Sequence, residues 1–167
     1  MKKQLFILFL IMHGFNTFAQ EVIDTTDIVI SRGKSDSYVP IWYHLKNQNS
    51  FDAKDRLASP YETHGEVSLS EDSRKTLSSI VHNSISTETL SVLHGKKIIL
   101  NVGVNSSGSI TNVMVGLRKE VADKVVFTKS ECMQIIHDIK KDVKFNIVQV
   151  FENKSGHISM TVPIKIE

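Results

Sequence analysis

The 167-residue chain has few of the residues that mark several common classes of protein. Its single cysteine, Cys132, excludes an intrachain disulfide, and its three prolines exclude a proline-rich spacer. Cys132 lies on the apolar stripe of a predicted helix, where we expect a buried hydrophobe rather than a nucleophile. The seven histidines show no HExxH motif and no metal-ligand spacing from the cysteine, and no G-x-S-x-G motif occurs. We therefore expect no catalytic residue, no metal and no cofactor.

A hydrophobic run long enough to cross a bilayer is also missing. The run from Leu5 to Met12 is about half the ~20 residues that a membrane helix needs, and two lysines precede it. Thr17 and Ala19 then place small residues at the two positions that a signal peptidase reads. This pattern predicts a signal peptide over residues 1–19, cleaved near Ala19-Gln20. We expect export to the periplasm or outer envelope and no transmembrane anchor in the mature chain.

An excess of basic charge is missing once the signal is set aside. Without its two lysines, 18 basic residues stand against 18 acidic ones. The pairs Lys96-Lys97 and Lys140-Lys141 are isolated, whereas phosphate binding requires a concentrated basic face. The composition therefore argues against nucleic acid as a partner.

Residues 20–67 carry the weakest pattern and are expected to form a partly irregular N-terminal extension. Tyr38–Leu45 is rich in β-formers, and Pro40 favours an edge or irregular strand there. The aromatic residues of this region have two interpretations: a binding surface, or packing over the end of the sheet, which we favour. These residues are Trp42, Tyr38, Tyr43 and Tyr61.

Two short helices are predicted next, at the start of a domain over residues 68–167. Ser68 and Glu71 match a capping box, which would begin the first helix. Thr87–Leu93 fits the second helix, and Gly95 follows it where a left-handed C-cap is needed.

The period changes to two from Lys96, which predicts β-strands. The turn Asn105–Gly108 joins two strands in a hairpin, a helix over residues 129–143 follows, and a last strand alternates from His157. The side chains expected to face the core from the first and last strands are Ile98, Leu100, Val102, Val104, Ile158, Met160, Val162, Ile164 and Ile166. The predicted fold is α+β. It has a three-stranded antiparallel sheet in the order β-β-α-β, preceded by helices, with helices packed on one face.

This order of elements resembles the C-terminal domain of TonB and its relatives. The residues that carry the resemblance are Leu93–Val104, Ser107–Val115 and Met160–Ile166, and the likeness covers residues 86–166. Phe145-Asn146-Ile147 stands where the family commonly has a Trp and a Pro. A predicted signal and three prolines also replace TonB's membrane anchor and Pro-rich spacer. The resemblance therefore implies the fold and the binding of a peptide along a sheet edge, but no coupling of energy between membranes.

The last strand is expected at an edge of the sheet. Pro163 has no amide hydrogen, so its backbone should point away from the neighbouring strand, and the odd-numbered residues from 157 to 165 share that direction. Pro163 and Lys165 are typical of edges that discourage pairing, and we favour this blunted edge over a docking strand. A partner strand, if one docks, would use residues 157–161. The candidate partner-binding residues are then His157, Ser159 and Thr161.

Two functional hypotheses follow from these features. The first is a non-enzymatic exported binding or structural protein of the cell envelope, which engages a protein or a peptide. The second is a small periplasmic hydrolase or ligand-binding protein, with its site between the N-terminal extension and the sheet. A deep pocket that gathers His44, His64 and acidic residues would favour the second, and a flat or extended arm would favour the first.

Overall fold

The computed structural model of the protein describes residues 27–33, 38–46, 67–105, 107–147 and 157–167. The predicted signal peptide, its cleavage point and most of the N-terminal extension lie outside these ranges and stay predictions. Within the described ranges, no helix is both long and apolar enough to span a bilayer.

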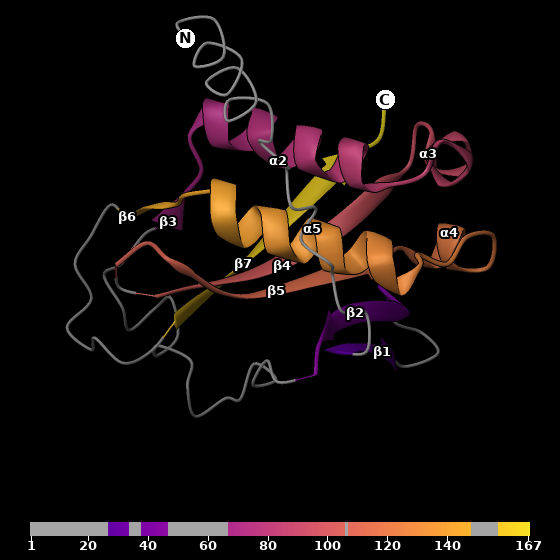
Figure 1. Ribbon diagram of the computed structural model, residues 1–167, viewed down its shortest axis with the longest axis horizontal. Helices are drawn as coiled ribbons and strands as arrows, with labels where there is room; N and C mark the ends of the chain where they lie inside the picture. The colour runs from indigo at the N-terminus through magenta and orange to yellow at the C-terminus, as the bar shows by residue number, and fades with distance from the viewer. Residues whose placement is uncertain (1–26, 34–37, 47–66, 106, 148–156) are drawn as a thin grey trace, which may run out of the picture.

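An antiparallel sheet of five strands forms the centre of the fold (Figure 1). The order is β1-β2-β5-β4-β7, and the bounds of these strands are Ile28–Arg32, Ile41–Leu45, Ile110–Leu117, Lys97–Asn105 and His157–Lys165. The short strands β3 (Val67–Ser68) and β6 (Asn146–Ile147) pair in a second, two-stranded sheet. The α+β class and the antiparallel sheet are confirmed, but the prediction of three strands is wrong.

The sheet has five strands because two strands from the N-terminal region continue it beyond β5. β2 pairs with β5 through Tyr43 and Val115, and β1 pairs with β2. This register leaves no part of Tyr43 exposed, and its hydroxyl oxygen accepts a hydrogen bond from the Phe127 amide at 3.0 Å. A large ring with a satisfied hydroxyl is a strong apolar anchor, so the added strands gain stability from the same core.

Helices cover one face of this sheet. Their bounds are Glu71–Ser84 for α2, Thr87–Leu93 for α3, Lys119–Ala122 for α4 and Lys129–Asp142 for α5. Figure 1 shows α5 over the sheet and α2 beside it; α5 contacts β5 and β2, and α2 contacts α5 and β7. Ile135, Ile136 and Ile139 of α5 share one apolar cluster with Ile98 and Leu100 of β4. Helix α5 therefore covers the side of the sheet that Ile98 and Leu100 face.

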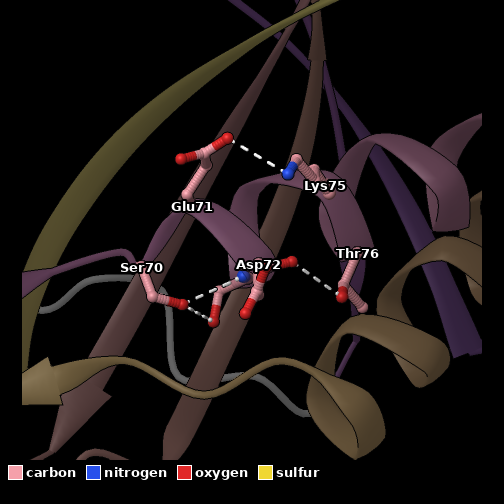
Figure 2. Close-up of polar contacts among 6 residues, drawn as sticks. Ser70, Glu71, Asp72, Lys75 and Thr76 are labelled. Atoms are coloured by element: carbon pink, nitrogen blue, oxygen red, sulfur yellow. Dashed lines mark hydrogen bonds and ion pairs between the residues drawn. The ribbon is translucent and has the colours of Figure 1, made fainter.

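The helix starts show which of the predicted caps are formed. Figure 2 shows Ser70 at the start of α2; its hydroxyl accepts a hydrogen bond from the Ser73 amide at 3.0 Å. The predicted capping box from Ser68 is wrong, because Ser68 belongs to β3 and lies before the cap. The α5 start is a complete capping box of Thr128 and Glu131.

The sheet face away from the helices, called the open face below, has a small apolar contact of its own. Val39 and Trp42 lie so close to Gly116 that a Cβ there would be 2.6 Å from Val39 and 2.7 Å from Trp42. Trp42 therefore packs on the sheet, whereas Tyr43 points to the helix side. Tyr61 lies outside the described residues.

Candidate functional site: the outer edge of strand β7

Strand β7 lies at one end of the sheet, and its backbone direction is fixed by the residue that follows it. The Ile166 amide donates to the Lys96 carbonyl at 3.0 Å, and the Ile166 carbonyl accepts from the Gly95 amide at 2.8 Å. Hydrogen-bonding direction alternates along an antiparallel pair. The even-numbered residues of β7 therefore direct their amides and carbonyls to β4, and the odd-numbered residues direct theirs to the outer edge. Pro163 is one of the odd residues, so its missing amide hydrogen costs the β4–β7 ladder nothing.

All three candidate residues lie along this outer edge. His157, Ser159 and Thr161 alternate along β7 and pair in register with Asn105, Gly103 and Asn101 of β4. Ser159 and Thr161 are exposed, and the Ser159 hydroxyl donates to the Asn101 side-chain oxygen at 2.6 Å. No described strand pairs with the outer edge of β7. The edge therefore presents backbone donors and acceptors at every second residue from 157 to 161.

The apolar side chains of β7 are covered unevenly. Val162, Ile164 and Ile166 are buried, whereas Ile158 and Met160 are only partly buried although they face the same side. α2 lies at the C-terminal end of β7 in Figure 1, and it contacts that strand. The expected inward direction of these residues is confirmed, but burial decreases toward residue 158. The N-terminal half of the strand thus has both partly exposed apolar side chains and outward amides that no proline removes. The alternating pattern did not predict that these two features occur together.

Three histidines of the described residues lie within hydrogen-bonding distance of an oxygen atom. His44 Nδ1 lies 3.1 Å from the Leu45 carbonyl oxygen, and His82 Nε2 lies 3.3 Å from the Glu167 carbonyl oxygen. His137 Nδ1 lies 3.2 Å from a carboxylate oxygen of Asp138. In the part of the chain that the structure describes, no three His, Cys, Asp or Glu side chains gather as a metal site would require.

At the second hypothetical site, between the N-terminal region and the sheet, the described N-terminal residues pack against the sheet. β2 is a strand of the sheet itself, and Val39 and Trp42 close over Gly116 on the open face. On the other face, desolvation by burial raises the pKa of Tyr43 to about 12, and the nearby charge of Glu131 acts in the same direction. The Tyr43 hydroxyl therefore stays protonated near neutral pH. His64 lies outside the described residues.

Native Cys132 is expected to react with a thiol reagent on the order of 100-fold or more slowly than in the urea-unfolded chain, because reaction requires a local opening. Its side chain has 0% exposure. Burial is the main cause that raises the pKa of its thiol, and the nearby charge of Glu131 raises it further. In the folded protein, Cys132 therefore forms little of the thiolate that reacts with the reagent. Labelling of the native protein followed by mass spectrometry measures the rate. Equal rates in the native and unfolded chains would show that Cys132 is accessible.

Comparison with known proteins informs the fold alone. No protein-family model and no curated protein matches the chain. The solved structure of a DUF5043 family protein from Bacteroides uniformis is similar, with a TM-score of 0.57 and 10% identity. The alignment covers 87% of this chain and 95% of that chain. The architecture therefore has a counterpart among solved structures, and the resemblance of residues 86–166 to the C-terminal domain of TonB stays a prediction.

Proposed function

We propose that the protein is a non-enzymatic, exported binding protein of the cell envelope that holds an extended segment of a partner protein along residues 157–161 of β7. The observation that carries the proposal is the coincidence on this half-strand of outward backbone groups with partly exposed Ile158 and Met160. A docked strand would pair with the backbone, and its own apolar side chains would lie beside these two residues. The TonB-like order of elements supports the same mode of binding.

Pro163 and Lys165 limit the backbone pairing of a docked segment to the N-terminal half of the strand. Pro163 offers no outward donor, and a charged side chain on an edge opposes pairing with further copies of the sheet. A completely open nine-residue edge would be a site of aggregation. The blunted half and the docking half of β7 are therefore compatible, because they occupy different residues.

Replacing Thr161 with proline is expected to weaken peptide binding by about 5- to 30-fold, since it removes one outward donor worth about 1–2 kcal/mol. The probes are nine-residue peptides selected on the whole protein from a display library. Because the Thr161 amide points away from β4, the substitution leaves the ladder of the sheet intact. Affinity is measured by calorimetry, and docking by the amide shifts of Ser159 and Thr161 in NMR spectra.

Thr161→Ala is the matched control for this experiment. It removes the same side chain but keeps the amide, so binding should stay within about threefold of the wild type. A urea melt of both variants checks that the fold is retained. Peptides that bind Thr161→Pro as well as the wild type, or that leave the amides of Ser159 and Thr161 unshifted, would refute docking on this edge.

A further inference from the structure

Two lysines lie directly opposite each other at the blunted end of the edge. Lys97 of β4 and Lys165 of β7 are register partners, and both are exposed. Their neighbours Ile98 and Ile164 are buried on the helix side, so both lysines extend on the open face. Among the described residues, no carboxylate forms an ion pair with either of them. Like charges directly opposite each other on a sheet are unfavourable, so an acid beside this pair would be favourable.

Arg118, which lies beside Lys97 at the end of the neighbouring strand β5, is a cation whose charge is balanced by contacts within the chain. Arg118 follows the last residue of β5, and Leu117 pairs with Ile98. The Arg118 guanidinium lies 4.1 Å from the centre of the Tyr38 ring, and its Nε is 3.5 Å from a Glu120 carboxylate oxygen. Among the described residues, an aromatic ring and an acid lie beside Arg118, whereas neither makes such a contact with Lys97 or Lys165.

A strand docked on β7 would place one of its own side chains beside this pair. Residues that pair across two strands share a face of the sheet. Backbone pairing ends before Pro163, but an extended partner continues alongside β7. If one of its residues lies opposite Thr161, the residue beside Lys165 is four positions away in the partner, or about 13 Å along the strand. Its side chain would extend on the open face next to Lys165. Lys97 lies on the far side of Lys165, because β7 separates the partner from β4.

From this register we infer that the segment held by β7 carries an aspartate or glutamate at this fourth position, with its carboxylate against Lys165 and Lys97. The inference rests on the proposed function. The position of the acid in the segment also reports the direction of the docked strand. The acid precedes the residue that faces Thr161 in an antiparallel partner and follows it in a parallel one. An exposed ion pair of this kind is expected to change the Kd by about 1.5- to 5-fold, and less at high salt.

The test is a selection from a display library of nine-residue segments with every position randomised. The whole protein is one target, and the double variant Lys97→Gln/Lys165→Gln is the other. Wild-type selection should enrich an acid at one end of the segment, four positions from the residue that faces Thr161. Selection on the double variant should still give binders, but without this enrichment. In a charge swap, Lys165→Glu should weaken an acidic peptide and be rescued by the same peptide with lysine at that position.

The outcomes separate this inference from the function on which it rests. Binders that lose affinity on Thr161→Pro but show no acid at the fourth position would refute the acidic partner and leave edge docking in place. Binders that carry the acid but bind Thr161→Pro unchanged would refute docking on the edge, and the inference with it. A selection that yields no binders would overturn both.

Discussion

Replacing Gly108 with alanine is expected to lower the free energy of unfolding by about 2–5 kcal/mol, from backbone strain of about 1–2 kcal/mol and overpacking of about 1–3 kcal/mol. Gly108 has a φ of +82°, in the left-handed region that side chains disfavour. A Cβ there would also lie 2.8 Å from the Phe145 carbonyl oxygen. A backbone atom cannot rotate away as a side chain can, so either the hairpin or the start of β6 must move.

Gly95→Ala is the matched control, because it carries only the first of these two costs. Gly95 has a φ of +72°, but no atom lies within 4 Å of the position of its added Cβ. We expect a loss of about 1–2 kcal/mol. Equilibrium urea unfolding measures both variants under the same conditions. Equal losses would show that the hairpin turn and the Phe145 backbone move apart at no cost, so that the close approach does not constrain the fold.

The elements that the sequence predicted well are those whose pattern and pairing are both local. β4 and β5 are joined by a four-residue turn, so Gly108 and the alternating valines fix their register within about twenty residues. Helix α3 has its predicted bounds, because Ser86 and Gly95 mark its two ends. The direction of the β7 backbone followed from Pro163 alone, since proline restricts which side of a strand faces a ladder.

The missed elements depend on contacts between distant parts of the chain. β2 pairs with β5 across about seventy residues, and the pairing depends on the burial of Tyr43 against Phe127. Gly116 was an available signal, because glycine inside a strand often marks a close approach by another group. Here that group is Val39 with Trp42, which no local pattern identifies as its neighbours.

The candidate site was predicted only in part, because some of its features are local and others depend on distant contacts. The outward residues of the edge were accessible to sequence reasoning, because alternation and one proline define them. The position of Lys97 opposite Lys165 was not, because it requires the register of β4 against β7. The partial burial of Ile158 and Met160 was not predictable either, because it depends on where the helices end over the sheet.

Replacing Glu131 with alanine is expected to destabilise the fold by about 2–4 kcal/mol, since three hydrogen bonds to a charged acceptor are lost. Glu131 is only 8% exposed, and its carboxylate joins two helix starts. One oxygen accepts from the Ser86 amide at 2.9 Å, and the other accepts from the Thr128 amide at 2.8 Å and the Thr128 hydroxyl at 2.9 Å. The residue therefore fixes the α2–α3 turn to the beginning of α5, beneath which β5 and β2 lie.

The pH dependence of stability tests the charge of this carboxylate. Desolvation raises the pKa of Glu131, but the hydrogen bonds from Ser86 and Thr128 outweigh it, so the pKa lies below its usual value of 4.5. Because the folded state holds the proton less tightly than the unfolded state, the stabilisation is complete above about pH 4.5 and is lost as the pH falls through the folded pKa. The stability difference between the wild type and Glu131→Gln should be greatest at neutral pH, at about 1–3 kcal/mol, and should shrink in acid.

Glu71→Gln provides the matched control, because Glu71 is also an acid in the first turn of a helix. Its side chain is 83% exposed and pairs with Lys75 at 3.1 Å, as Figure 2 shows. An exposed pair with this spacing contributes about 0.3–0.5 kcal/mol, and salt screens it. Urea melts from pH 3 to pH 7 compare the two variants with the wild type. Equal losses from both, or a Glu131→Gln loss that is independent of pH, would mean that the ionised carboxylate does not hold the two helix starts together.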